Sequence, residues 1–404
     1  MQQIMLRSID NKIMYNYSRC MQCGACEAVC PKGAITMKMR DDATHDVMVD
    51  DGKCIRCQRC VKVCPANKEV DYKGYFDGFD KKHYFLGYNV DDKVRRESSS
   101  GGVCKTIVIN SLKQGLADGV YTLRRTDGFP FAEGEFYTKD NIPGYENMPN
   151  SVYHTLLACC NIDKIKKCKH LIVVGTSCQL RAMNAALKGK ADEIIRVCIF
   201  CKQQKTLDST RFLAKMMGTR VPENRKFFVR YRGQGWQGIV RVNEAMLLWN
   251  RAASLPFGKR LWTVPGCNAC GDPFGTNAEA DISLMDPWNI RQTNNLGETL
   301  VTVHTNRGME LLKNIDTIKL EEKSFDEVKP ALDLKDVWHK QQLVPFFRGE
   351  MCSDVIHKAG KAELRQRKFL RTFIEITPRM PLLFYRALCH FWPDARNRIL
   401  SDKN

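Results

Sequence analysis

The residues in this sequence best suited to chemistry are cysteines arranged in two matching runs. The first run is Cys20, Cys23, Cys26 and Cys30, and the second is Cys54, Cys57, Cys60 and Cys64. A proline follows each run directly, and each cysteine of the second run lies 34 residues after its counterpart. The two runs therefore form an internal duplication that can be read directly from the chain.

This spacing is that of bacterial ferredoxins, in which the fourth cysteine of each run ligates the other run's cluster. Two [4Fe-4S] clusters are therefore predicted, since thiolate is the soft ligand that iron–sulfur clusters need. The predicted ligand sets are Cys20, Cys23, Cys26 and Cys64 for one cluster and Cys54, Cys57, Cys60 and Cys30 for the other. The alternative is a pair of zinc sites, but zinc needs neither the third cysteine nor the proline.

Two further features of this region bear on the clusters. Residues 34–50 alternate apolar and polar side chains around a polar turn, which predicts a hairpin joining the two runs. Lys53, Arg56, Arg59 and Lys62 are interleaved with the second run. Their charge would favour the more negative reduced cluster and so predicts a higher potential for it; the alternative is that these side chains are solvated and screened.

A segment rich in serine and glycine opens the next part of the chain. Ser98, Ser99, Ser100, Gly101 and Gly102 precede an apolar pattern over residues 103–116 that is typical of a buried helix. Small residues with free backbone N–H groups at a helix start can bind an anion. An ordinary serine N-cap is the alternative. Residues 71–88, rich in Tyr, Phe, Gly and Asp, are interpreted as a linker along the surface of the next domain.

An apolar strand over residues 171–174 runs into a tight turn at Gly175 and Thr176, which places Cys178 at the strand's carboxyl end. Residues 193–200 form a second predicted strand, which ends at Cys201. Apolar strands between helices favour an α/β core with parallel strands. Ligands of such sheets bind at the carboxyl ends of the strands.

Two later loops also carry candidate residues. Arg232 and Trp236 lie in a glycine-rich loop and could pair with or stack on a planar anionic ligand, or the tryptophan could simply pack in a hairpin. Cys267 and Cys270 form a CxxC pair, which by itself suits half of a zinc site or a redox pair.

Five segments in order resemble the beta-subunit family of coenzyme F-420 hydrogenases and dehydrogenases. They are residues 98–102, 175–179, 199–201, 231–236 and 267–288. The sequence departs from the usual family pattern at Ser177, where proline is common, and at Met285, where glycine is common. The second departure weakens the case that coenzyme F-420 itself is the partner.

The resemblance implies a flavoprotein that binds FAD and a third [4Fe-4S] cluster. The third cluster's ligands would be Cys178, Cys201, Cys267 and Cys270, with Cys198 the one competitor for Cys201. FAD would contact Ser98, Ser99, Ser100, Gly101, Gly102, Gly175, Thr176, Arg232 and Trp236, with its phosphates on the serine–glycine turn. No general acid can be named; His154, His304 and Asp286 are merely candidates. The remaining cysteines, which include Cys159, receive no role.

The resulting fold prediction is an α+β ferredoxin-like module over residues 1–80, followed by an α/β body that binds flavin and iron–sulfur. The body divides into residues 81–165 and 166–350, which resemble the family's N- and C-terminal domains, and residues 351–404 form a basic C-terminal segment. The predicted function is electron transfer between FAD, at a small organic substrate or deazaflavin-type coenzyme, and a ferredoxin or redox partner subunit. The alternatives are a relay subunit without a substrate site, and a ferredoxin fused to an unrelated binding domain.

The bulk composition narrows these classes. Nineteen cysteines and no evident secretory signal favour metal or redox chemistry over disulfides and predict a cytoplasmic protein. No apolar run of about 18 residues is present, so no transmembrane helix is predicted. The formal charge is +18, and three clusters at −2 each would lower it to about +12. No nucleic-acid motif accompanies the charge, so a nucleic-acid partner is not expected.

The C-terminal segment is basic and partly apolar. Residues 356–404 hold 11 Lys and Arg against 4 Asp and Glu, with aromatic and aliphatic side chains interspersed. Such a stretch can lie peripherally on an anionic membrane or dock a partner. The interpretation favoured from sequence is a helix packed on the body with a solvated basic face.

Overall fold

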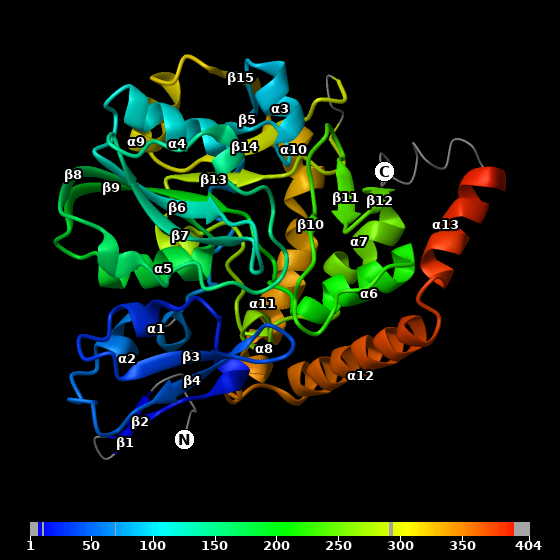
Figure 1. Cartoon of the computed structure of the whole chain (residues 1–404), viewed down its shortest axis with the longest axis horizontal. Helices are drawn as coiled ribbons and strands as arrows, with labels where there is room; N and C mark the ends of the chain where they lie inside the picture. Colours follow the sequence, from blue (N-terminus) through cyan, green and yellow to red (C-terminus); the bar gives the residue numbers. More distant parts are fainter. Residues whose placement is uncertain (1–6, 10–11, 69, 291–293, 392–404) are drawn as a thin grey trace.

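The computed structural model describes residues 7–9, 12–68, 70–290 and 294–391 of the chain. A small cysteine-rich module lies beneath a larger α/β body, and two long C-terminal helices run along the outside (Figure 1). Within the described residues, no helix is long and apolar enough to cross a membrane.

The module consists of two small hairpins and two short helices. Its elements are β1 (Arg7–Ile9), β2 (Lys12–Met14), α1 (Ala25–Ala28), β3 (Ile35–Met39), β4 (His45–Val49) and α2 (Arg59–Val63). The strands β3 and β4 pair antiparallel, which confirms the predicted hairpin between the cysteine runs. Each helix carries the third cysteine of its run, and the fourth follows where the helix has ended.

An eight-stranded mixed sheet forms the centre of the body. In spatial order its strands are β15 (Ile318–Lys323), β5 (His83–Asn89), β14 (Thr299–Val303), β13 (Ile282–Met285), β9 (Ala191–Ile199), β8 (Cys168–Gly175), β6 (Gly119–Arg125) and β7 (Ala132–Thr138). The neighbours β6, β8, β9 and β13 are parallel, as the apolar strand patterns predict. Strands from both residues 81–165 and residues 166–350 share this one sheet.

Helices cover both faces of the sheet. The body's helices are α3 (Asp92–Glu97), α4 (Val103–Lys113), α5 (Ser177–Ala186), α6 (Leu207–Met217), α7 (Arg251–Gly258), α8 (Pro265–Asn268), α9 (Asn306–Lys313), α10 (Phe325–Leu332), α11 (Leu334–Arg348), α12 (Asp354–Ile376) and α13 (Met380–Phe391). On one face, α4 and α9 pack on the sheet. On the other, α5 lies between the sheet and the cysteine-rich module (Figure 1).

A smaller unit stands beside the main sheet. Its strands are β10 (Val229–Arg230), β11 (Ile239–Val242) and β12 (Ala245–Leu248), and they pair antiparallel. Side chains of α6, α7 and α13 share its hydrophobic core. This unit carries Arg232 and Trp236 in the loop between β10 and β11.

Residues 71–88 do not form the predicted surface linker, because aromatic side chains of this segment are buried. Tyr75 and Phe79 are buried together with Phe274 and side chains of α10. The Tyr75 hydroxyl donates a hydrogen bond to Asp272 at 2.6 Å. Burying a large aromatic side chain is more favourable than leaving it in solvent on an exposed linker. The segment therefore packs on the body and ties the module to it.

Gly101 provides a test of how tightly the serine–glycine turn is packed. A Cβ at this position would lie 2.3 Å from the Gly87 carbonyl oxygen and 2.9 Å from the Thr299 amide nitrogen. Both are backbone atoms, so Gly101→Ala should destabilise the protein by about 1–3 kcal/mol and lower its melting temperature. The control is Gly128→Ala, because a Cβ there meets nothing within 4 Å. Equal melting temperatures for the two variants would contradict this packing.

Candidate redox site

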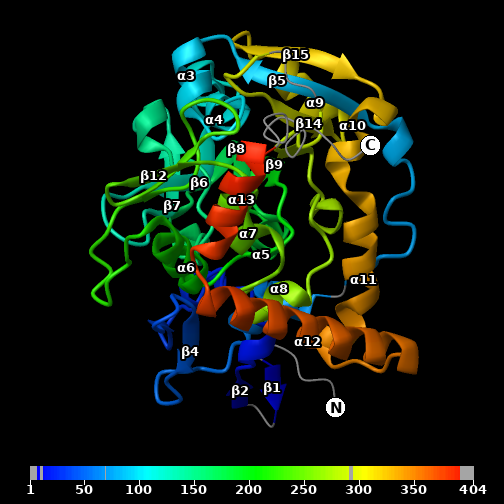
Figure 2. The same cartoon turned by 90° about the vertical axis from the view of Figure 1, so that its right-hand side faces the viewer.

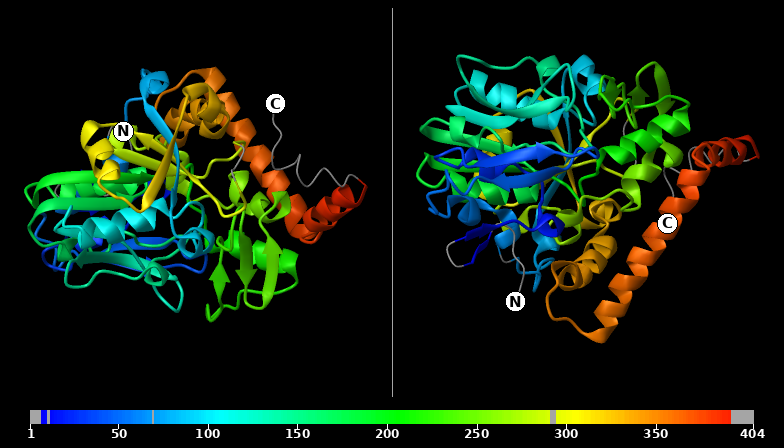
Figure 3. Two further views of the ribbon diagram at one scale, coloured as in Figure 1. Left: turned by 90° about the horizontal axis from the view of Figure 1, so that it is seen from above. Right: turned by 60° about the horizontal axis from the view of Figure 1, so that its bottom comes forward.

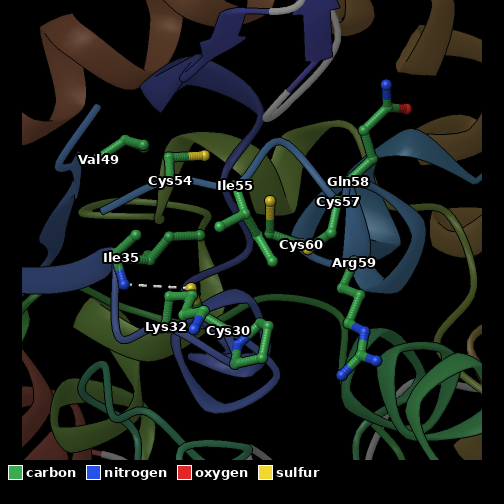
Figure 4. A pocket seen from close by; sticks show the side chains of 12 residues that line it. Cys30, Lys32, Ile35, Val49, Cys54, Ile55, Cys57, Gln58, Arg59 and Cys60 are labelled. Atoms are coloured by element: carbon green, nitrogen blue, oxygen red, sulfur yellow. Dashed lines mark hydrogen bonds between the residues drawn. The ribbon is translucent and has the colours of Figure 1, made fainter. Parts of the chain in front are cut away.

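The eight cysteines of the module separate into the two predicted crossed sets. Burial raises the pKa of the Cys64 thiol, and the nearby Cys23 and Cys20 thiols raise it further. Burial likewise raises the pKa of Cys60 to about 11, with Cys30, Cys54 and Cys57 as its thiol neighbours. Those four side chains also line one pocket, shown in Figure 4. The fold therefore brings each fourth cysteine to the other run.

The two sets differ in exposure. The thiols of Cys20, Cys23, Cys26 and Cys64 are all buried, and we call them the inner set. In the outer set, Cys57 is exposed, Cys54 and Cys30 are half-buried, and Cys60 is buried. Of the two sets, the outer one is therefore the one that reaches solvent.

Four further cysteines gather at the carboxyl edge of the main sheet. Cys178 lies in the first turn of α5 directly after β8, Cys201 follows β9, and Cys267 and Cys270 lie in and just after α8. Burial raises the pKa of Cys178 well above its usual value, and the Cys270, Cys267 and Cys201 thiols act in the same direction. We call these four residues the third set.

Cys198, the competitor for Cys201, lies inside β9 instead. It is fully buried, pairs with Gly175 and Ser283 in the sheet and packs beside Ala280. Among the thiol neighbours of Cys178, the foremost are the other three members of the third set and not Cys198. The structure thus favours Cys201 as the member from this strand.

The inner set lies directly against the third set. A Cβ on Gly266, next to Cys267, would lie 2.2 Å from the Cys20 carbonyl oxygen, so the two cysteine loops touch through their backbones. Cys20, Cys26, Cys64 and Cys270 share one buried cluster, with Cys178 packed at its margin. The three sets therefore form a continuous row from the solvent to the edge of the sheet.

Two buried lysines flank the third set. Lys205 is 2% exposed, and its Nζ donates to the Leu261 carbonyl at 2.9 Å. Burial lowers its pKa; Cys267 opposes that effect, while Arg367, Arg260 and Lys340 reinforce it. Lys340 is also buried and acts to lower the pKa of Cys201 and Cys267. Buried cations require nearby negative charge, so this neighbourhood suits an anionic group on the thiolates. Neither lysine belongs to a motif, and no sequence signal identifies them.

Arg232 organises the polar side of the same sheet edge. Its guanidinium is fully buried and donates to Asp286 Oδ2 at 2.6 Å and to the Ser99 carbonyl at 3.0 Å. Asp286 directly follows β13, so its place at this edge comes from the same parallel sheet as Cys178 and Cys201. The structure therefore brings the serine–glycine turn, the Arg232 loop and the Asp286 loop together, which sequence spacing alone could not show.

Three tryptophans surround this guanidinium. The ring centroids of Trp236, Trp249 and Trp288 each lie 5.3 Å from it. Trp249 is buried, whereas Trp236 and Trp288 are half-buried and lie 4.9 Å apart between centroids. The Arg232 charge is already paired with Asp286, so the accessible part of this site is formed by Trp236 and Trp288. We call these two rings the aromatic rim.

The serine–glycine turn is held by protein contacts. The Ser98 hydroxyl donates to the Val94 carbonyl at 2.7 Å, Ser99 Oγ accepts from the Ser151 amide at 2.9 Å, and Ser100 Oγ lies 3.1 Å from Thr299 Oγ1. Gly102 caps α4 with a φ of 81°, a conformation that favours glycine. The predicted turn before a buried helix is confirmed.

Positive charge collects at the first turn of α4. Burial first, and then the charges of Arg230 and Arg125, lower the pKa of Lys105 to about 8. Arg125 ends β6 and so lies at the carboxyl edge with the other site residues. A cluster of cations at a helix start favours an anion there.

Gly175 and Thr176 lie with the third set. Thr176 caps α5, with its amide donating to Gln179 Oε1 at 2.9 Å, and its hydroxyl lies 3.4 Å from Cys178 Sγ.

Met285 is buried in the core beside Phe274 and Leu300, so its side chain is packed inside the protein.

The two candidate histidines are structural. His154 is fully buried, with Nδ1 2.7 Å from the Tyr231 hydroxyl and Nε2 2.9 Å from the Pro130 carbonyl, and burial lowers its pKa to about 4. His304 follows β14 beyond the opposite edge of the sheet, where Ser283 and Lys82 bind its ring; burial, then Lys82, lowers its pKa to about 3. Asp286 is paired with Arg232, so none of the three candidates is free to act as a proton donor.

Comparisons with known families agree with this arrangement. Residues 84–140 match the N-terminal model for the beta subunit of coenzyme F-420 hydrogenase/dehydrogenase, and residues 168–328 match the corresponding C-terminal model. Together they span more than half of the chain. The chain belongs to this family. It is preceded at residues 19–68 by a match to a 4Fe-4S dicluster domain.

The search of curated proteins gave no match. Among solved structures, a chain of the xenon-derivatised F-420-reducing [NiFe] hydrogenase complex from Methanosarcina barkeri is similar, with 19% identity and a TM-score of 0.47. The similarity covers 64% of this chain and 89% of that chain.

Several predictions are settled by these matches. The chain is an iron–sulfur electron-transfer subunit of an oxidoreductase family, and the 4Fe-4S dicluster match replaces the zinc alternative for the two cysteine runs. Among the described residues, no three or more His, Cys, Asp or Glu side chains are arranged to hold a single metal ion.

Cys159, to which sequence reasoning gave no role, lies beside the inner set. It is fully buried, and its amide donates to the Cys23 carbonyl at 2.7 Å. Its thiol is hydrogen-bonded to Cys23, which lowers the pKa of Cys23, and its Sγ lies 3.9 Å from the Gln179 carbonyl next to Cys178. Cys159 therefore contacts the chain on both sides of the seam between the inner and third sets.

Replacing Cys159 should change the potential of the inner cluster. Hydrogen bonds to cluster sulfurs stabilise the reduced state, so Cys159→Ala should lower one midpoint potential in an EPR-monitored titration. Cys159→Ser keeps a donor and should shift it less. The control is Cys160→Ala, at the neighbouring half-buried cysteine. Identical midpoints in the wild type and Cys159→Ala would show that this contact has no such effect.

The buried His154 should make the protein less stable in mild acid. Its pKa is about 4 in the folded state and 6.5 ordinarily, so the unfolded chain binds more protons below pH 6.5. Lowering the pH from above 7.5 to 5.5 should therefore cost about 1.4 kcal/mol through this residue. Unfolding experiments should show a shallower pH dependence for His154→Gln than for the wild type. Parallel profiles would contradict the assignment.

Proposed function

We propose that this protein is an iron–sulfur flavoprotein oxidoreductase that passes electrons between FAD and a ferredoxin or partner subunit through three [4Fe-4S] clusters. The observation that carries the proposal is the row of cysteine sets from the exposed Cys57, through the inner set, to the third set at the sheet edge. A row of this kind, with one end in solvent and the other at a ligand edge, suits electron transfer between two sites.

A third cluster on Cys178, Cys201, Cys267 and Cys270 is supported by the charge around these residues. A [4Fe-4S] cluster in the +2 state on four thiolates carries a net charge of about −2. Lys205 and Lys340 are buried beside the thiols, and their charges would be compensated by such a group. Two buried cations would also favour its reduced state.

FAD is supported by the basic first turn of α4 and by the aromatic rim. Lys105 and Arg125 would attract its phosphates near Ser98–Gly102, with Arg230 beside them in an ion pair with Glu97, and Trp236 and Trp288 would pack against its ring system. When bound, FAD couples two-electron chemistry of a substrate or deazaflavin coenzyme to one-electron transfer by clusters. Arg232 and Asp286 hold the three loops of this site in place.

The outer set offers a surface for the electron partner. Arg56 and Arg59 are exposed beside Cys57, and Lys53 is exposed before Cys54. Basic groups around an exposed cluster attract an acidic redox protein such as a ferredoxin.

A relay subunit without flavin remains the second candidate. It is favoured by the contacts of the serine turn, because all three serine hydroxyls already have protein partners. The ion pair of Arg232 with Asp286 points the same way.

Anaerobic purification with iron, sulfide and flavin analysis should distinguish the two. We expect about twelve irons per chain, as three four-iron clusters require, and one FAD. Cys201→Ala should lower the iron to about eight while the module's clusters remain. The matched control is Cys198→Ala, which should keep the full iron content. Twelve irons without flavin would favour the relay, and a count near eight in the wild type would refute the third cluster.

A further inference from the structure

The two C-terminal helices bury only one side of themselves. In α12, Gly360 and Ile374 are buried, and Leu370 and Ile374 pack against Phe212 and Trp262 of the body. In α13, Leu382 is buried in the core of the small β unit. The packed helix favoured from sequence is therefore present, but it accounts for only one face of each helix.

The opposite faces carry large apolar side chains in solvent. On α12, Phe369 is 74% exposed, Phe373 49% and Ile376 75%. Their spacing of four and three residues places them on one stripe of the helix. This outward stripe departs from the sequence expectation of a merely solvated basic face.

Large apolar side chains are also exposed on α13, after the break near Pro378. The exposed apolar residues there are Met380, Leu383, Phe384 and Phe391, with exposed fractions of 50%, 58%, 70% and 82%. Figures 2 and 3 show α12 and α13 following one another along the outside of the molecule. Exposed apolar side chains that gather on consecutive helices in this way mark an interaction site. We call the seven outward residues of the two helices the C-terminal apolar face.

Basic side chains lie along the same helices. Arg365, Lys368, Arg379 and Arg386 are exposed. Helical geometry puts Arg365 beside Phe369 on the outward side of α12, and Lys368 one turn from Arg365 at the flank of the apolar stripe. Among the described residues, no ion pair involves Arg365, Lys368 or Arg386, whereas Arg367 and Arg371 on the same helix are paired with Glu363 and Glu375. The unpaired cations are thus those nearest the apolar stripe.

We propose that the C-terminal apolar face docks on the surface of an anionic lipid bilayer, with the helices lying in the plane of the interface. Apolar side chains would enter the acyl boundary while Arg365, Lys368, Arg379 and Arg386 contact lipid phosphates. A second copy of the chain fits this face poorly, because pairing two such faces would bring the same cations together.

Docking at this face leaves the electron-transfer surface free. Cys60 of the outer set lies in α2 at one side of the molecule and α13 lies at the other, with α12 running between them (Figure 1). The protein would thus stay open to a soluble redox partner while held at the lipid surface. This inference concerns the outward faces of α12 and α13, which carry none of the proposed cluster ligands, and it does not depend on the proposed cofactors.

Co-sedimentation of the full chain with vesicles tests the proposal. Binding to vesicles containing phosphatidylglycerol should be at least tenfold tighter than to pure phosphatidylcholine and should weaken as salt is raised. Leu383→Glu/Phe384→Glu should weaken binding more than tenfold, and Arg365→Glu/Lys368→Glu should do the same. Since all four residues are exposed, cluster absorbance and melting temperature should stay at wild-type values.

Matched controls place the same changes elsewhere on the surface. Met246→Glu/Leu248→Glu alters two exposed apolar residues of β12, and Lys113→Glu/Lys313→Glu reverses two exposed charges; both should bind like the wild type. The proposal would be overturned if the α12 and α13 variants bound anionic vesicles as tightly as the wild type does. It would also be overturned if the wild type showed no preference for anionic vesicles over phosphatidylcholine vesicles. So would the absence of vesicle binding together with a dimer that Leu383→Glu/Phe384→Glu dissociates, since a second copy would then cover the face.

Discussion

Parallel pairing of β8 with β9 and of β9 with β13 determines where the chemistry of this protein lies. In register, Gly175, Cys198 and Ser283 stand side by side in the sheet. The residues that follow these strands therefore emerge at one edge, and they include Cys178, Cys201 and Asp286. The third cysteine set and the Arg232–Asp286 pair are close because the strands that carry them run in the same direction.

Charge compensation is the second constraint. Lys205, Lys340 and Arg232 are all buried in the body, and each requires negative charge within a short distance. Asp286 supplies it for Arg232, whereas the ionisable groups that act on Lys205 are the Cys267 thiol and other cations. Some of the residues that contribute to the formal charge of +18 are therefore buried in the body near the cysteine thiols, and do not lie on the surface.

At the seam between the module and the body, backbone segments approach each other closely because glycines leave room for them. Gly266 lets the third set's loop meet the backbone at Cys20, and Gly24 lets the strap of residues 157–160 approach the first cysteine loop. Arg181 of α5 adds hydrogen bonds to the Pro65 and Lys68 carbonyls at 2.7 and 3.1 Å. The buried aromatic side chains of Tyr75 and Phe79 add to this attachment.

The sequence by itself determined the features that depend on local spacing. The two cysteine runs predict their clusters from spacing alone, because each run supplies three closely spaced thiols and a fourth for the other cluster. The hairpin, β8, β9 and α4 follow from short-range apolar periodicity. The five family segments also lie in order along the chain. Only the tertiary structure decided which distant residues meet. It groups Cys178, Cys201, Cys267 and Cys270, with Lys205 and Lys340 beside them, and it places Cys159 at the seam and Arg232 with Asp286 and three tryptophans. It also showed that the rings of His154 and His304 are hydrogen-bonded to protein groups, and that the C-terminal helices expose an apolar face. These outcomes depend on strand order and on which side of each element is buried, and residues far apart in the chain carry no local signal of either.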